Sequence, residues 1–228
     1  MVDQTTRKRI LEATERIFAE KGYAAMTLRE VTEAAGVNLA AVNYHFGSKE
    51  GLLTGMIERR VGPINEKRMA LFEEARAAYG EGPIPLERIW QIIMEPLAEA
   101  LETESGYDVG FLRMIARSIT EPSDFIQQTN NRFFRDLKEV AIREVYRNFP
   151  ELGMEAVAYR IYLASSTMTG MIVQHERMTL ELLALVDLSD IRKLFDEMVR
   201  FVCAGMREQL QTAARIAAKT GEDQGCMS

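Results

Sequence analysis

The feature that most constrains this chain is a series of apolar residues at three- and four-residue steps, interrupted by glycine and proline. Residues at those steps lie on one face of an α-helix, so each uninterrupted stretch predicts one helix. No stretch alternates apolar and polar residues for long enough to indicate a sheet. The sequence therefore predicts an all-α fold of about nine helices, without internal repeats.

The predicted helices follow one another with short breaks. They cover residues 7–21, 27–35, 39–46, 49–77, 86–103, 107–120, 123–148, 154–178 and 188–211. Gly22, Gly36 and Gly47 end the first three, because glycine readily adopts the left-handed conformation found after a helix. A kink is expected at Gly62-Pro63, and the tail, residues 220–228, is expected to be frayed or disordered.

Composition narrows the classes of protein. A chain of 228 residues can bury its own apolar core, and its net charge of −6 argues against bulk attraction to nucleic acid or an anionic membrane. Its longest uncharged stretch, residues 161–175, is too short and too polar to cross a bilayer. Two cysteines cannot form a disulfide framework, and the N-terminus lacks a signal-peptide pattern. We therefore expect a cytoplasmic protein without a membrane partner.

The first fifty residues carry the most specific local pattern. Thr27 and Glu30 have the spacing of a capping box at the start of the second predicted helix. Gly36 stands where a tight turn between two helices needs a positive φ, and Asn38 is a suitable N-cap for the third helix. This order predicts a helix-turn-helix unit.

The third predicted helix has two different faces. Val42 and Phe46 are four residues apart and point inward, which leaves an outward face of Leu39, Ala40, Asn43 and Tyr44. Tyr44 and His45 are compact hydrogen-bond donors that suit phosphate oxygens. The ring of Tyr44 can equally well just cover apolar surface, so both interpretations stay open from the residues alone.

The run TLREVTEAAGVNLAAVNYHFGSKEGLL, residues 27–53, closely resembles the DNA-binding domain of tetracycline-repressor-like (TetR-family) transcriptional regulators. The resemblance covers residues 7–55 and rests on Phe18, Gly22, Thr27, Ala35, Gly36, Val37, the Tyr44-His45 pair before Phe46, Lys49 and Glu50. Asn38 departs from it mildly, since serine or threonine is usual there. The resemblance implies a DNA-binding domain over residues 1–51 and an effector-binding and dimerisation domain over residues 52–228.

The resemblance also implies a role for individual residues, with the third helix in the major groove of double-stranded operator DNA. Base edges would be contacted by Leu39, Ala40 and Asn43. Phosphates would be contacted by Thr27, Asn38, Tyr44, His45 and Lys49. Residues 1–50 hold seven basic and seven acidic side chains, so this domain has no overall basic footprint.

The larger domain resembles the family only in layout, which implies a small-molecule effector and a homodimer. The expected pocket residues are Trp90, Met94, Phe111, Met114, Arg117, Met168 and Met171. Abundant methionine suits a hydrophobic effector such as a fatty acid, an acyl thioester or another apolar compound. Arg113 and Arg117 lie four apart and either receive an anionic group or, as we favour, are solvated.

The last long helix is the expected dimer interface. Its candidate residues are Leu194, Met198, Phe201 and Val202. Small side chains of the helix before it would allow close approach of the two helices, and two such pairs would form a four-helix interface. The alternative is that these apolar residues pack only inside one chain.

The sequence thus predicts a ligand-responsive repressor that binds a palindromic operator as a homodimer and is released by a small hydrophobic effector. One alternative is a helical protein-interaction module without a DNA role. The other is an all-α enzyme, but a di-metal bundle needs Glu-x-x-His pairs, and Val42 and Ile172 stand three residues before the two histidines. We expect no catalytic residues, no metal and no cofactor.

Overall fold

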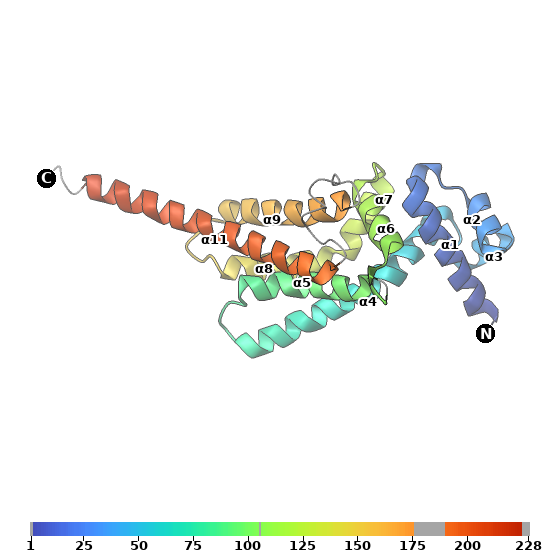
Figure 1. Cartoon of the computed structure of the whole chain (residues 1–228), viewed down its shortest axis with the longest axis horizontal. Coiled ribbons are helices and arrows are strands. Elements are labelled where there is room, and N and C mark those ends of the chain that lie inside the picture. Colours follow the sequence, from blue (N-terminus) through green and yellow to red (C-terminus); the bar gives the residue numbers. More distant parts are fainter. Residues whose placement is uncertain (1, 105, 176–189, 225–228) are drawn as a thin grey trace.

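The computed structural model describes residues 2–104, 106–175 and 190–224. The molecule is elongated, with a small helical domain at the N-terminal end and a long C-terminal helix that extends past the other end (Figure 1). The predicted helix ends at residues 178 and 188 lie outside the described residues, as do residues 225–228 of the tail. The tail prediction therefore stays a prediction, although the last helix reaches Gln224.

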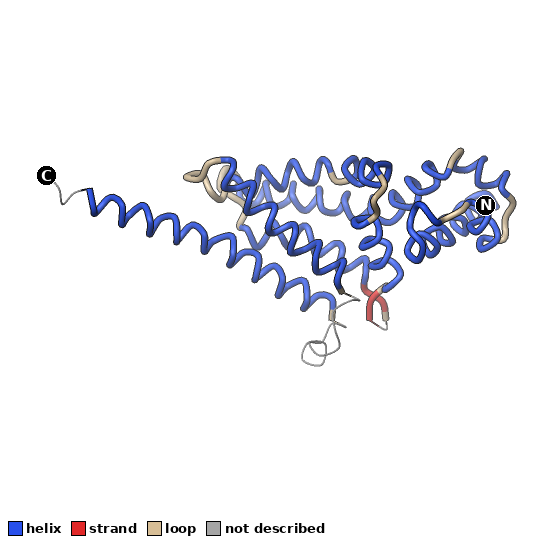
Figure 2. Tube along the Cα trace, turned by 90° about the horizontal axis from the view of Figure 1, so that it is seen from above, coloured by secondary structure: helices blue, strands red, loops and turns tan. Residues whose placement is uncertain are grey.

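The all-α prediction is confirmed, and the described residues hold ten helices where about nine were predicted. The first four are α1 (Val2–Ala25), α2 (Leu28–Ala35), α3 (Leu39–Phe46) and α4 (Lys49–Tyr79). The others are α5 (Leu86–Leu101), α6 (Val109–Thr120), α7 (Asp124–Phe133), α8 (Arg135–Arg147), α9 (Met154–Gln174) and α11 (Ile191–Gln224). A two-residue antiparallel pair, β1 (Glu102–Thr103) and β2 (Gly106–Tyr107), links α5 to α6 (Figure 2).

Helix α1 is the scaffold of the small domain. Ile10, Leu11 and Phe18 are fully buried, which confirms that its periodic apolar residues form one inward stripe. The predicted stop at Gly22 is visible as a break in the helical angles, with φ 76° and ψ −179°. The positive φ favours glycine at this position, and a side chain there would also displace the Glu121 carboxylate at the end of α6.

The predicted helix over residues 123–148 is wrong as one element, because α7 and α8 are separate helices. The chain leaves the helix at Phe134, with φ −103° and ψ 5°. Just before this break, Asn65 of α4 donates a 2.9 Å hydrogen bond to the backbone oxygen of Phe133. Helix α7 packs on α4 and α6, whereas α8 packs on α4, α5 and α9. The break is therefore set by tertiary contacts that the sequence pattern does not contain.

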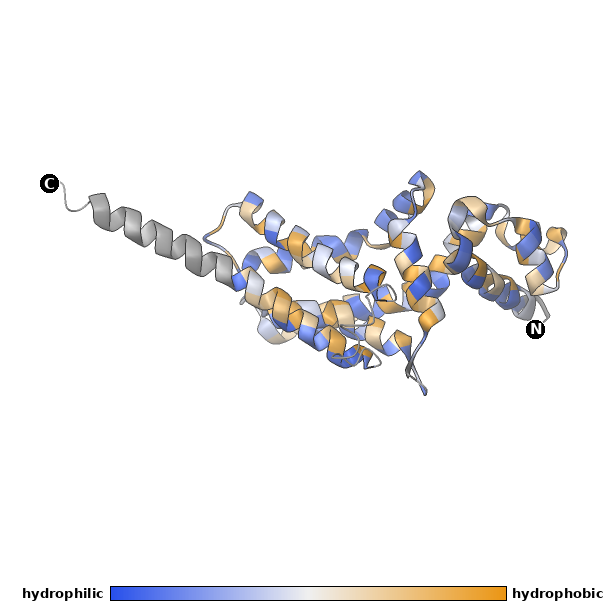
Figure 3. Cartoon of the chain, turned by 45° about the horizontal axis from the view of Figure 1, so that its top comes forward, coloured by the Kyte–Doolittle hydropathy of each residue, from blue (hydrophilic) through white to orange (hydrophobic). Residues whose placement is uncertain are grey.

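Helix α4 runs from the small domain into the larger one and continues through Pro63, near the predicted kink. In the larger domain, α11 packs against α5 and α9 packs against α6, α8 and α11. Hydrophobic and hydrophilic residues are interspersed along α9 and α11, as expected for helices with one inward face (Figure 3). Among the described helices, none combines the length and apolar character that crossing a bilayer requires.

Cys203 of α11 is a test of the packing of α11 against α5, because its burial depends on that packing. Its side chain is buried, and burial raises the pKa of its thiol to about 12. A short way along α11, Arg207 forms an ion pair with Glu87 of α5. The thiol is therefore shielded from solvent and protonated at neutral pH.

We expect Cys203 to resist the thiol reagent DTNB in the folded protein. In a Cys226→Ser variant it is the remaining cysteine, so labelling can be assigned to it. The thiolate is the reactive form, and labelling should be at least about 100-fold slower in the folded protein than in urea. Equal rates in the two conditions would show that α11 does not cover this position.

Candidate DNA-binding surface and effector cavity

Local hydrogen bonds fix both ends of α2. The hydroxyl of Thr27 accepts a bond from the backbone N–H of Glu30 (3.2 Å), and the Glu30 carboxylate accepts one from the backbone N–H of Thr27 (3.0 Å). Hydrogen bonds from Lys21 and Thr27 lower the pKa of the Glu30 carboxyl to about 2. At the other end, Gly36 has φ 61°, and Arg9 of α1 donates to its carbonyl oxygen (3.0 Å). The predicted capping box and turn are both present.

The short helix α3 is held from one side. The side chain of Asn38 accepts a 2.9 Å hydrogen bond from the backbone N–H of Ala41, which caps the helix. Val42 is fully buried, and Phe46 is half-buried, with the guanidinium of Arg7 5.4 Å from its ring centroid. These anchors leave the opposite face of α3 exposed.

The structure brings the three residues with predicted base contacts together on this exposed face. Leu39 is half exposed, and Ala40 and Asn43 are exposed. At this end of the molecule, α2 and α3 lie farthest from the larger domain (Figure 1). The face is therefore accessible to a large partner such as a DNA duplex.

The residues with predicted phosphate contacts surround this face in different states. Thr27 and Asn38 are exposed, and Tyr44 is exposed over 79% of its surface. His45 is half-buried, with its ring 5.1 Å from that of Tyr44. Lys49 differs from the others, because its ammonium donates to the backbone oxygen of Tyr23 (2.6 Å). A phosphate would have to share that ammonium, which has three N–H donors.

The larger domain contains an apolar cavity of about 470 Å³. This volume lies in the range of small-molecule sites, roughly 300–1,000 Å³. Five of the predicted pocket residues line it: Trp90, Met94, Phe111, Met114 and Met168. Within the described chain, Met171 is half-buried and is not part of this lining.

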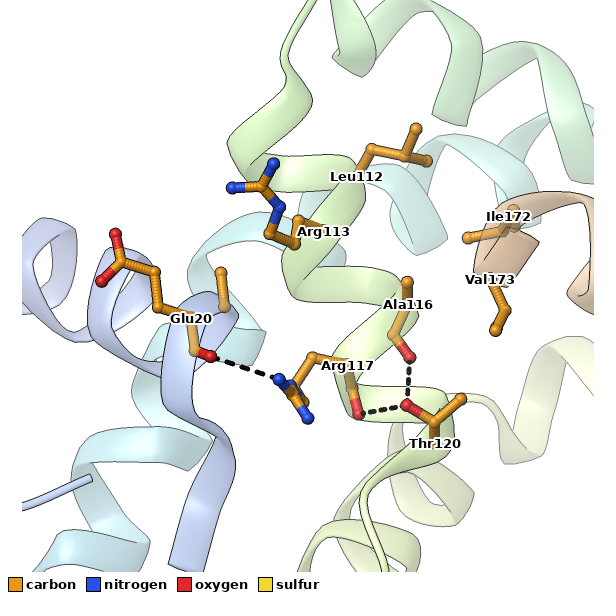
Figure 4. A pocket seen from close by; sticks show the side chains of 9 residues that line it. Glu20, Leu112, Arg113, Ala116, Arg117, Thr120, Ile172 and Val173 are labelled. Atoms are coloured by element: carbon orange, nitrogen blue, oxygen red, sulfur yellow. Dashed lines mark hydrogen bonds between the residues drawn. The ribbon is translucent and has the colours of Figure 1, made fainter. Parts of the chain in front are cut away.

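Arg117 lies outside the cavity, in a hollow of about 360 Å³ formed by α1, α6 and α9 (Figure 4). Its guanidinium extends toward α1 and donates to the backbone oxygen of Glu20 (3.2 Å). Arg113 extends from the same helix one turn earlier. The structure thus gives Arg117 a contact between the two domains and separates it from the other predicted pocket residues.

The polar residues of the cavity wall were not among the predicted site residues. Gln127, Asn130 and Asn131 of α7 line the cavity, although they lie in a segment predicted as part of one long helix. Arg68 of α4 is buried and also lines it. The sequence signal is that Arg68 lies on the same helix face as Ile64, Leu71 and Phe72, which are apolar.

One cluster of charges joins the cavity wall to the small domain. We call Arg60, Glu15 and Asp108 the interdomain ion cluster. Arg60 of α4 lies 3.1 Å from the Glu15 carboxylate of α1 and pairs with Asp108, which caps α6 through the backbone N–H of Phe111 (2.9 Å). Its guanidinium lies 3.9 Å from the centroid of the Phe111 ring, and Phe111 lines the cavity. Three helices therefore meet at one arginine.

The predicted dimer residues do not all lie at the surface. Met198 and Val202 are buried, and Leu194 is half-buried, because this side of α11 packs on α5 and α9. Phe201 points away from that core and is 71% exposed. Of the four residues, Phe201 alone presents a large apolar surface to solvent.

Helix α9 adds exposed apolar residues beside Phe201. Tyr159, Tyr162 and Leu163 are all exposed, Tyr162 over 68% of its surface. Leu163 and Phe201 line the same shallow groove between α9 and α11. We call Tyr159, Tyr162, Leu163 and Phe201 the α9–α11 face. Outward-facing aromatic residues in the helix over residues 154–174 are the sequence signal that would have identified it.

These features define a class of protein: a helix-turn-helix DNA-binding regulator with a second helical domain. Residues 10–56 match the family model for bacterial regulatory proteins of the tetR family, and residues 91–205 match the tetracyclin repressor-like C-terminal domain. The chain belongs to the TetR family of transcriptional regulators, and it binds DNA through its helix-turn-helix. The resemblance drawn from residues 7–55 is confirmed.

Individual relatives agree with this assignment. The transcriptional repressor AcnR of Corynebacterium glutamicum is 43% identical over 169 residues, which cover 71% of this chain and 85% of AcnR. The regulator BetI of Rhizobium meliloti is 29% identical over 92 residues, which cover 40% of this chain and 42% of BetI, less than half its length. The relatives are named as regulators, so the expectation that the chain is not an enzyme is confirmed by its family.

Among solved structures, the SmeT–triclosan complex has a TM-score of 0.57 and 21% sequence identity. The comparison covers 85% of this chain and 89% of that one. At this identity, the similarity establishes the fold.

We expect Arg60→Leu to destabilise the protein in a pH-dependent way. Burial raises the pKa of the Glu15 carboxyl and Arg60 opposes that shift, so removing Arg60 raises the pKa further. An acid with a raised folded-state pKa destabilises the fold once it ionises. The loss in free energy of unfolding that Glu15 causes should therefore be small at about pH 4.5 and grow as the pH rises. Urea unfolding should show a loss of about 1–3 kcal/mol near neutral pH.

The control for this experiment is Arg200→Leu, which removes an exposed pair with Glu197 on α11. It should change the free energy of unfolding by less than about 0.5 kcal/mol at every pH. A loss in Arg60→Leu that does not depend on pH would contradict the role of Glu15.

Proposed function

We propose that this regulator is a homodimeric repressor that binds a palindromic operator and leaves it when a small hydrophobic molecule enters the cavity of the larger domain. The observation that carries the proposal is the contact of Arg60 with both Phe111 of the cavity wall and Glu15 of the DNA-binding domain. The name of AcnR as a repressor supports the direction of regulation. Such a protein acts on chromosomal DNA, so we place it in the cytoplasm.

On DNA, the exposed face of α3 would lie in the major groove. The amide of Asn43 can pair bidentately with adenine, and Leu39 and Ala40 can contact thymine methyl groups. Tyr44, His45, Lys49, Thr27 and Asn38 would bind phosphates and fix the register. Because residues 1–50 are neutral overall, we expect few phosphate contacts and a modest dependence on salt.

Dimerisation would supply a second recognition helix, the α3 of the other copy. One short helix reads only a few base pairs, and a palindromic site needs two such helices about 34 Å apart. The α9–α11 face is apolar and exposed in the single chain, and an exposed patch of that kind commonly marks an interface. Pairing two copies of α9 and α11 would bury it in a four-helix arrangement.

Effector binding would act on α1 and α4 together. A ligand in the cavity contacts the wall that includes Phe111, and the ring of Phe111 lies against Arg60. Movement of that ring would change the pairing of Arg60 with Glu15 and Asp108 and shift α1 relative to α6. A ligand that binds only the shifted arrangement would lower the affinity for the operator.

The neutral charge of residues 1–50 favours one second candidate, a protein-interaction module that no longer binds DNA. Selection of bound sites from random duplexes tests it directly. Recovery of a palindromic motif supports the repressor, and recovery of no motif at low salt supports the interaction module.

Two substitutions on α3 distinguish base reading from phosphate binding. Asn43→Ala should cost about 1–3 kcal/mol on the selected operator and little on an unrelated duplex, because it removes a base contact. Tyr44→Ala should weaken binding to both duplexes by about tenfold, because it removes a hydrogen bond to a charged phosphate. Fluorescence anisotropy with the two labelled duplexes measures both effects.

The matched control on DNA is Tyr79→Ala, which alters an exposed tyrosine at the far end of α4 and should leave both affinities unchanged. If Asn43→Ala lowers the affinity for the two duplexes equally, Asn43 does not read a base. If Tyr44→Ala leaves both affinities unchanged, Tyr44 does not bind a phosphate.

We expect Phe201→Asp to dissociate the dimer, because it places two charges in the proposed apolar interface. The dissociation constant of the dimer should rise at least about 30-fold, as for a hot-spot residue. Light scattering during gel filtration measures the mass, and circular dichroism verifies the helix content. The control Tyr79→Asp replaces another exposed aromatic residue with the same charge, and this variant should stay dimeric. A dimer that persists in Phe201→Asp would place the interface on another surface.

A further inference from the structure

The described charged side chains that line the cavity of the larger domain are all basic, although the protein as a whole is acidic. Among the described residues that line it, none is an aspartate or a glutamate, whereas Arg68 and Lys138 both line it. The whole chain, by contrast, has 34 acidic and 28 basic residues. The wall is therefore apolar with two positive charges, inside a protein with a net negative charge.

Arg68 is the more constrained of the two cations. It lies in α4 with 5% of its surface exposed, where its Nε donates to the backbone oxygen of Ile93 (2.8 Å) and its Nη1 to the side-chain oxygen of Asn65 (2.9 Å). In the described part of the chain, no carboxylate lies within ion-pair distance of it. Burial lowers the pKa of its guanidinium to about 10, so the group stays charged at neutral pH.

A buried charge without a counter-ion is costly, and such a site gains free energy when an anion binds. The amides that line the cavity are neutral, so none of them is a counter-ion for Arg68. Asn130 donates to Ser118 (2.8 Å), and Gln127 donates to Glu121 (3.1 Å). The described hydrogen bonds that Arg68 donates therefore go to neutral oxygens alone.

Lys138 marks the side where the cavity meets solvent. It is exposed and also lines the cavity, and its ammonium donates to the side-chain oxygen of Asn131 (3.0 Å). An anion that enters on this side would meet a positive charge first and then the apolar wall that leads to Arg68. The two cations thus favour anions both on entry and when bound.

We propose that the effector of this regulator is an amphipathic monocarboxylate, with its apolar body against Trp90, Phe111 and Met114 and its carboxylate on Arg68. The proposal rests on the proposed function only in that it takes this cavity as the effector site. Because Nε and Nη1 of Arg68 each already donate one hydrogen bond, a carboxylate would bind through the remaining guanidinium N–H groups. Such charge-assisted hydrogen bonds are stronger than those that a neutral alcohol of the same length can form. The carboxylate can belong to an alkyl chain or to an aromatic acid.

The single tryptophan of the chain provides a direct measurement of binding. Trp90 lines the cavity and is 3% exposed, so its fluorescence reports on occupancy. The full-length protein is titrated with decanoate, with decan-1-ol and with cinnamate, each below its aggregation concentration. We expect the wild type to bind decanoate about tenfold to 100-fold more tightly than decan-1-ol. The ratio of cinnamate to decanoate affinity distinguishes aromatic from alkyl acids.

The key variant is Arg68→Met, which keeps an apolar side chain of similar length but removes the charge. It should lose the preference for decanoate and bind decan-1-ol within about threefold of the wild type. Arg68→Lys should keep a reduced preference, and it provides the test if the methionine variant does not fold by circular dichroism. Arg200→Met, an exposed position on α11, is the matched control and should behave as the wild type.

Equal affinity of the wild type for decanoate and decan-1-ol, or a preference that survives in Arg68→Met, would overturn the proposal. Operator binding is measured in the same samples to separate the two levels of inference. If decan-1-ol binds and releases the operator without an acid preference, the anion site fails while the proposed regulation stands. If neither probe changes Trp90 fluorescence or operator affinity, both fail.

Discussion

Helix α4 packs in both the small domain and the larger one, and the other features of the molecule depend on this arrangement. Its 31 residues span about 46 Å, enough to cross from the DNA-binding domain deep into the larger one. Near its start, Leu52, Leu53 and Met56 are buried in the small domain, and farther along, Arg68 and Phe72 are buried in the larger one. Helix α4 therefore connects the cavity wall directly with the support of α3.

Contacts between α1 and α6 form a second connection between the domains. The interdomain ion cluster and the bond from Arg117 to Glu20 both cross this boundary, one beside the cavity wall and one in the neighbouring hollow. Such polar contacts have a defined geometry, unlike apolar packing, and they weaken steeply when the partners separate. In the proposed regulation, this boundary is where a ligand would change the arrangement of the two domains.

Local sequence rules predicted the structure of the helix-turn-helix better than they predicted which residues of the larger domain are buried or exposed. The caps at Thr27 and Asn38 and the turn at Gly36 depend on neighbours within four residues, and each is found as expected. The methionine and aromatic residues of the central helices included five wall residues of the cavity. Arg117 was wrongly assigned to the wall, because helical spacing does not reveal which neighbour a face meets. Periodicity likewise predicted Met198 at the dimer surface, although that side of α11 packs on α5.

The sequence by itself determined the all-α class, the helix-turn-helix and the outward face of α3, because these follow from hydrogen bonds and apolar spacing within single short segments. Tertiary structure alone decided the break at Phe134, the meeting of Arg60 with Glu15, and the position of Arg68 in an apolar wall. Each of these depends on residues more than forty positions apart or on the packing of several helices. Their free energy comes from burial and charge in a shared interior, which no single segment contains.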